Sequence, residues 1–109
     1  MKPVGTHIVA EFHQCRKEVL NDRQALESIL TRGIQECGLT FVNITSHCYD
    51  PVGITVIAVI SESHVAVHTY PEARHASIDV FTCSPHKAIT ENLLEYLKEA
   101  MGPVTTRVA

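Results

Sequence analysis

Reactive side chains of several kinds crowd into one short part of this 109-residue chain. Residues 61–72 read SESHVAVHTYPE and residues 78–83 read IDVFTC, so hydroxyls, imidazoles, carboxylates and a thiol follow closely on one another. These side-chain types can act as nucleophile, general base, general acid or metal ligand. This part of the chain is therefore the first place to look for chemistry.

Two common kinds of site fit these residues poorly. His64 and His68 share one face of an extended strand, but at about 3.3 Å per residue they lie roughly 13 Å apart, too far to bind one metal ion. Ser63 lacks the G-x-S-x-G elbow of a hydrolase, because Glu62 and His64 flank it. We expect no metal site and no serine-hydrolase triad. Taken alone, the residues also fit a plain strand with one polar face.

The surrounding chain predicts strands and two helices. Helices are expected at residues 22–37, between a cap at Asn21 or Asp22 and a stop at Gly38, and from Pro85 to about Met101. Strands are expected at residues 5–12, 39–49, 54–61, 63–69, 76–83 and, at an edge, 104–108. In the strand at 76–83, Ile78, Val80 and Thr82 alternate with polar residues and Phe81.

This order of elements favours an α+β fold, a two-layer sandwich with both helices on one face of a mostly antiparallel sheet. The length suits one domain, residues 1–109. The other sheet face is left for solvent or a partner, so a dimer is expected. Residues 54–61 are almost wholly apolar, which is typical of a strand covered on both faces.

Composition excludes several functions. The formal net charge is -3 with no basic block, so nucleic-acid binding is not expected. The longest apolar run, residues 52–60, is far short of the ~20 residues that span a bilayer, and the N-terminus does not resemble a signal peptide. We expect a cytoplasmic protein. Its four cysteines form no C-x-x-C pair and are expected to be thiols, with Cys15, Cys37 and Cys48 as small core residues.

Three motifs together resemble the prokaryotic S-adenosylmethionine decarboxylase proenzyme family. They are SESH at 61–64, HTYPE at 68–72 and DVFTC at 79–83. GTHIVAE at 5–11 and HCYDPVG at 47–53 are also similar to that family, and His64 and Glu11 fit its pattern. The resemblance extends from Gly5 to about Leu97 and implies a specific chemistry.

The resemblance implies that the precursor cuts itself between Glu62 and Ser63. The Ser63 hydroxyl would attack the Glu62 carbonyl to give an ester, and elimination followed by hydrolysis would leave a covalent pyruvoyl group at the start of chain 63–109, beside chain 1–62. His68 matches the base of the elimination, a role in which histidine is the commonest side chain. Thr55 lies where the family usually has Ser and would support the ester step.

The resemblance also implies how a substrate is turned over. The pyruvoyl ketone forms a Schiff base with the α-amine of S-adenosylmethionine and acts as electron sink while carbon dioxide leaves, as a step toward polyamines such as spermidine. Cys83 matches the proton donor, Glu72 a carboxylate that binds ribose, and Tyr49 an aromatic that stacks on adenine. The site of the family is shared across a homodimer.

Several positions depart from the family pattern, mostly around the substrate pocket. They are Cys48, Asp50, Tyr70, Arg74-His75, and Ser84-Pro85 after the thiol. A pyruvoyl-dependent arginine or ornithine decarboxylase is therefore an alternative, with Asp50 as an anionic partner for a basic head group. A catalytically silent regulatory partner is a second alternative, although the joint presence of Ser63, His68 and Cys83 argues against it.

Overall fold

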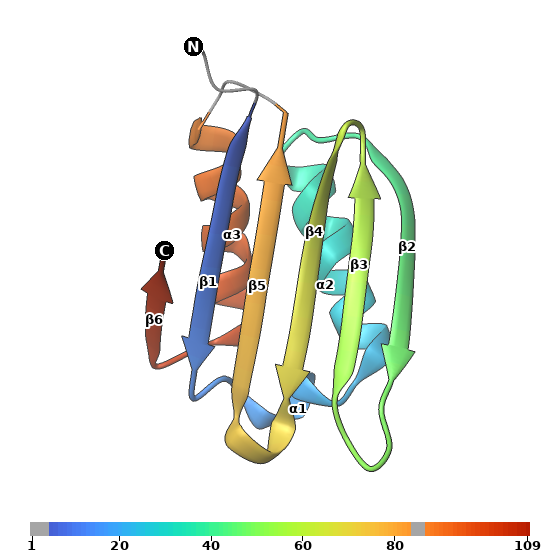
Figure 1. The fold of residues 1–109 in the computed structure, drawn as a ribbon, viewed down its shortest axis with the longest axis vertical. Helices are drawn as coiled ribbons and strands as arrows, with labels where there is room; N and C mark the ends of the chain where they lie inside the picture. The colour runs from blue at the N-terminus through green and yellow to red at the C-terminus, as the bar shows by residue number, and fades with distance from the viewer. Residues whose placement is uncertain (1–4, 84–86) are drawn as a thin grey trace.

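A computed structural model describes residues 5–83 and 87–109 of the chain. Six strands form one antiparallel sheet in the order β2-β3-β4-β5-β1-β6, and the longer helices lie behind it (Figure 1). The elements are β1 (Thr6–His13), α1 (Lys17–Leu20), α2 (Arg23–Glu36), β2 (Phe41–Cys48), β3 (Ile54–Ile60), β4 (Ser63–Tyr70), the 3₁₀ turn η1 (Pro71–Ala73), β5 (His75–Thr82), α3 (Lys87–Met101) and β6 (Thr105–Val108). The predicted two-layer α+β fold is confirmed.

Local signals set the ends of helix α2. The Asp22 carboxylate accepts a hydrogen bond from the Ala25 backbone N–H at 3.0 Å, and Gly38 has a left-handed φ of 76° just after the helix. The predicted start of the second helix at Pro85 lies outside the described residues. The four-residue helix α1 was not predicted, because one turn is too short to show helical periodicity. No helix among the described residues is long and apolar enough to cross a membrane.

The core fills the space between the helices and the inner face of the sheet. Ile78, Val80 and Thr82 of β5 are buried there, as their alternation predicted. Helices α2 and α3 touch each other at Gly33, where a Cβ atom would lie 2.7 Å from the ring of Tyr96. This close packing holds both helices on one side and leaves the outer face of the sheet uncovered.

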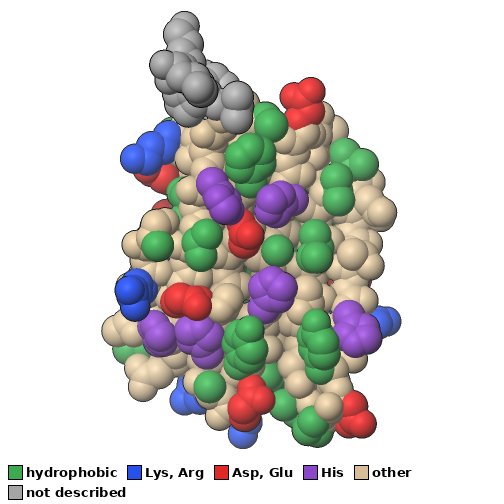
Figure 2. Space-filling view, viewed as in Figure 1, with side chains coloured by type: hydrophobic (Ala, Val, Ile, Leu, Met, Phe, Trp, Pro, Cys, Tyr) green, Lys and Arg blue, Asp and Glu red, His purple; other side chains and the backbone are tan. Residues whose placement is uncertain are grey.

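The outer face carries a mixture of apolar and histidine side chains (Figure 2). Ile57 and Val59 of β3 are 36% and 43% exposed there, although β3 was predicted to be covered on both faces. That prediction is wrong for the single chain, because the helices cover only the inner side. The apolar residues on the outer side are suited to contact with another protein surface.

Candidate active site

Ser63 begins β4 directly after the tight turn that joins β3 to β4. Ile60 and Ser63 are the last paired residues, so Ser61 and Glu62 form the connection. Glu62 has a φ of 59°, in the left-handed region that favours glycine. A carboxylic-acid side chain in that conformation carries backbone strain of order 1 kcal/mol. The peptide bond expected to break therefore follows a strained residue.

The hydroxyl of Ser63 is held by the end of β5. The Cys83 backbone N–H donates a hydrogen bond to Ser63 Oγ at 2.9 Å. Gly5 packs closely against the same segment, since a Cβ atom at position 5 would collide with the Thr82 carbonyl oxygen and lie 3.2 Å from Cys83 Cα. Ser63 and Cys83, which are twenty positions apart in sequence, thus lie side by side.

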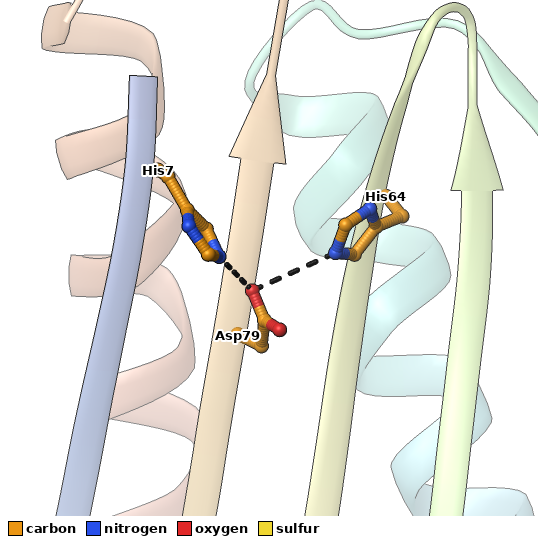
Figure 3. A network of polar contacts seen from close by, with 3 residues as sticks. All are labelled: His7, His64 and Asp79. Carbon is orange, nitrogen blue, oxygen red and sulfur yellow. Dashed lines mark hydrogen bonds and ion pairs between the residues drawn. The ribbon is translucent and has the colours of Figure 1, made fainter. Parts of the chain in front are cut away.

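An imidazole–carboxylate cluster lies on the outer face near this end of the sheet. Asp79 Oδ1 accepts a hydrogen bond from His7 Nε2 at 2.6 Å and lies 3.5 Å from His64 Nε2 (Figure 3). Phe81 packs against both rings, with centroid distances of 5.9 and 6.0 Å. Asp79 and Phe81 belong to the DVFTC motif, but the sequence alone predicted no role for them. Both residues occupy the outward-facing positions of the alternating pattern of β5, and this pattern could have indicated a shared surface.

A second group of predicted residues lies near the other end of the sheet. His68 Nδ1 shares a hydrogen bond with Thr55 Oγ1 at 3.0 Å, and Thr55 Oγ1 shares another with the Tyr49 hydroxyl at 3.1 Å. Together with Tyr70 and Glu72, these side chains line a pocket of about 220 Å³. The pocket joins an aromatic face, a carboxylate and an imidazole, which suits a ligand with a flat ring and hydroxyl groups.

The two groups do not meet within one chain. Ser63 and His68 are five residues apart on β4, so they are separated by roughly 16 Å along the strand. Of the predicted site residues, the structure brings Ser63 together with Cys83 and, separately, Tyr49, Thr55 and Glu72 with His68. A base at His68 can reach residue 63 only if it comes from another copy of the chain.

A further carboxylate lies on β1, level with His68 across the sheet, since Ser77 of β5 pairs with both Glu11 and His68. Ser77 donates a hydrogen bond to Glu11 Oε1 at 2.9 Å, and His75 Nε2 lies 3.3 Å from Glu11 Oε2. The His13 ring packs on His75 with a centroid distance of 4.8 Å. Within residues 5–83 and 87–109, however, no group of histidines, cysteines and carboxylates is arranged to hold a metal ion.

The four thiols differ in accessibility. Cys15 is fully buried, and burial raises the pKa of its thiol, although Arg74 opposes that shift. Cys37 is half-buried, and burial also raises its pKa, with Glu36 adding to the effect. Cys48 is exposed, so its predicted core position is wrong, because it is the last residue of the edge strand β2, whose inner positions are only half-buried even beside α2. Cys83 is exposed too, beside Ser63.

Comparison with known proteins shows the family to which this chain is similar. A sequence profile described as S-adenosylmethionine decarboxylase matches residues 6–109, nearly the whole chain. The chain belongs to the S-adenosylmethionine decarboxylase family. It is 40% identical over 102 residues to an S-adenosylmethionine decarboxylase proenzyme of Methanococcus maripaludis, covering 90% of this chain and 83% of that one. It is 44% identical over 105 residues to the proenzyme of Thermotoga petrophila, covering 93% and 77%.

Solved structures support the same fold. The adenosylmethionine decarboxylase of Aquifex aeolicus superposes with a TM-score of 0.92 at 21% identity, covering 100% of this chain and 89% of that one. The Trypanosoma brucei AdoMetDC-delta26 monomer gives a TM-score of 0.69 at 14% identity, covering 94% of this chain and 44% of that one. The predicted resemblance to the S-adenosylmethionine decarboxylase family is thus confirmed.

Proposed function

We propose that the chain is the precursor of a pyruvoyl-dependent S-adenosylmethionine decarboxylase that cuts itself between Glu62 and Ser63. The observation that carries the proposal is the hydrogen bond from the Cys83 backbone to the Ser63 hydroxyl, directly after the strained Glu62. Membership of the family gives that arrangement its chemical meaning. The products are chains 1–62 and 63–109 of a single domain.

Self-cleavage uses the chain's own side chains. The Ser63 hydroxyl attacks the carbonyl carbon of Glu62. Backbone strain at Glu62 lowers the free-energy barrier to this attack. His68 acts as the base that removes the Cα proton of residue 63 in the following elimination. Thr55 keeps His68 oriented through the 3.0 Å hydrogen bond and can donate to the oxygen on which charge develops.

Turnover uses the same residues around the group formed from Ser63. When present, the pyruvoyl group supplies an electron sink for decarboxylation. The exposed Cys83 thiol returns a proton to the substrate carbon as a general acid. Glu72 accepts hydrogen bonds from ribose hydroxyls, while Tyr49 offers an aromatic face to adenine and the sulfonium cation. The decarboxylated product serves polyamine synthesis in the cytoplasm.

A homodimer completes the site. A two-fold axis that runs across the strands, between two facing sheets, reverses strand direction from one copy to the next. The Ser63 end of one sheet then faces the Tyr49–Thr55–His68 pocket of its partner, and symmetry gives two equal sites. The exposed Ile57 and Val59 would be covered in this arrangement. It accounts for the distance between Ser63 and His68 in one chain.

The protein is first incubated, and its self-cleavage is checked by mass spectrometry. The test then measures carbon dioxide released from carboxyl-labelled amino acids. Label should be released from S-adenosylmethionine, and much less from arginine or ornithine. Release from arginine or ornithine alone would contradict the proposed substrate. A single uncut species of 12.1 kDa that releases nothing would favour a silent partner.

Strain at the cleavage point predicts an unusual effect of glycine. Glu62→Gly is expected to stabilise the uncut fold by about 1 kcal/mol, measured by urea unfolding in a Ser63→Ala background, because glycine accepts positive φ freely. In the chain with Ser63 it should slow cleavage about fivefold, since the released strain no longer assists the attack.

A matched control for this variant is Gln14→Gly. Gln14 has a φ of 57° and is exposed, but it follows the far end of β1, away from Ser63. It should gain similar stability without any change in cleavage rate. Equal cleavage rates for Glu62→Gly and the native chain would show that strain at Glu62 does not assist cleavage.

The hydroxyl of Tyr49 gives a further prediction. Tyr49→Phe keeps the aromatic face but removes the 3.1 Å hydrogen bond to Thr55, which orients His68. We expect cleavage to slow about fivefold, the equivalent of a net hydrogen bond of about 1 kcal/mol, while KM for S-adenosylmethionine changes little. Time courses on denaturing gels measure the first quantity and steady-state assays the second.

Tyr70→Phe is the comparison for this prediction. Tyr70 lines the same pocket, and its hydroxyl makes no hydrogen bond to residues 5–83 or 87–109. Cleavage of Tyr70→Phe should match that of the native chain. An identical slowing in both variants would mean that pocket polarity, rather than the link to Thr55, controls cleavage.

A further inference from the structure

We infer that the backbone N–H of Cys83 is a catalytic group of self-cleavage, distinct from the Cys83 thiol, and that it stabilises charge on Ser63 Oγ. This inference rests on the proposed function, because it concerns the reaction that cuts the chain. It gives one residue two separate tasks. The amide acts while the precursor is cut, and the side chain acts afterwards on substrate.

The amide is free for this task because Cys83 lies just beyond the paired part of β5. The ladder between β4 and β5 starts with His64 opposite Phe81, and the ladder between β1 and β5 ends with Thr6 opposite Thr82. The next N–H along the chain, that of Cys83, points to Ser63 Oγ at 2.9 Å. It is therefore the first backbone donor after β5, and it is directed at a side chain rather than at a neighbouring strand.

The position of this N–H is fixed from the core side. Thr82 is fully buried, and its hydroxyl is hydrogen-bonded to that of Thr90 on α3 at 2.8 Å. Gly5 brings β1 close against the same peptide, since a Cβ atom there would collide with the Thr82 carbonyl oxygen. A donor anchored in this way needs no reorganisation when charge appears on its acceptor, which is the condition for electrostatic catalysis.

The bonds that form and break place the charge on Ser63 Oγ. In the first step Oγ bonds to the Glu62 carbonyl carbon, the C–N bond to residue 63 breaks, and the hydroxyl proton ends on the freed amine. In the second step a base takes the Cα proton, the Cβ–Oγ bond breaks, and its electron pair leaves with Oγ in the new Glu62 carboxylate. Hydrolysis of the remaining dehydroalanine consumes water and releases ammonia.

The hydrogen bond should matter most in the second step. In the ester Oγ is a weak acceptor, whereas in the elimination it becomes part of a carboxylate anion. A donor that gains strength as charge grows lowers the barrier, while one that binds both states equally does not. Loss of the N–H should therefore slow elimination and allow the ester to accumulate.

The test compares two full-length chains made by chemical synthesis and refolded. One carries Cys83→Ala, which removes the thiol but keeps the N–H. The other is the same chain with lactate in place of that alanine, so that an ester oxygen replaces the single N–H. Cleavage is followed by intact mass. Hydroxylamine is added to samples to reveal an internal ester at residues 62 and 63, and the masses of its fragments differ from those released at the lactate ester between residues 82 and 83. Cys83→Pro, made by expression, provides a second chain without the N–H.

We expect Cys83→Ala to cut, and the lactate chain to cut about 10- to 100-fold more slowly with an ester that hydroxylamine splits. Circular dichroism and thermal unfolding confirm that the compared chains are folded. Equal rates for the two synthetic chains would overturn the inference and leave the proposed function intact. Failure of both the native and the Cys83→Ala chains to cut would instead contradict the proposed function itself.

Discussion

Ser63→Ala is expected to give one uncut chain of 12.1 kDa with no measurable decarboxylation. The variant removes the only atom of residue 63 that can attack the Glu62 carbonyl, and without cleavage there is no ketone to react with a substrate amine. The fold should persist, because the loss is one hydrogen bond from the Cys83 N–H, worth about 1 kcal/mol. Denaturing mass spectrometry and a carbonyl-labelling reagent measure the two losses separately.

Ser63→Thr is the informative companion to this variant. It keeps a hydroxyl for attack but adds a methyl group beside the turn, so cleavage should be slow rather than absent. Its fragment should carry one more methylene in the terminal keto group than the native fragment. Normal cutting and turnover by Ser63→Ala would show that another residue starts the reaction, and the role given to Ser63 would be lost.

Local features of the fold were predictable from sequence because their causes are local. The Asp22 cap, the left-handed Gly38 and the alternation of β5 each depend on residues within one element. The apolar β3 was misjudged because its pattern reports only that both faces avoid water. It does not say whether a helix of the same chain or another subunit covers the outer face.

The site was predictable in its residue types but less so in its geometry. That Cys83 lies against Ser63 depends on the pairing of β4 with β5, in which His64 opposes Phe81, and no local pattern fixes that register. The separation of Ser63 from His68 was available from sequence. Five positions along a strand place two residues roughly 16 Å apart. The family resemblance implied a site shared by two chains, and this distance favours the same division.

The proposed division of the site between two chains predicts that two inactive variants will restore each other. Ser63→Ala and His68→Ala should each remain uncut alone. When they are co-expressed with tags of different mass, a mixed dimer contains one site with Ser63 from the His68→Ala chain and His68 from the Ser63→Ala chain. Only the His68→Ala chain should be cut, and about half of it if equal amounts of chains pair at random.

The double variant supplies the control that makes this result decisive. A chain carrying both Ser63→Ala and His68→Ala can form mixed dimers with His68→Ala but offers neither residue, so no cutting should follow. Restored cutting in the first mixture and none in the second requires His68 to act across the interface, as its distance of roughly 16 Å from Ser63 within one chain demands. Native mass spectrometry that detects mixed dimers without any cutting would contradict the shared site, and rapid cutting of His68→Ala by itself would remove His68 from the reaction.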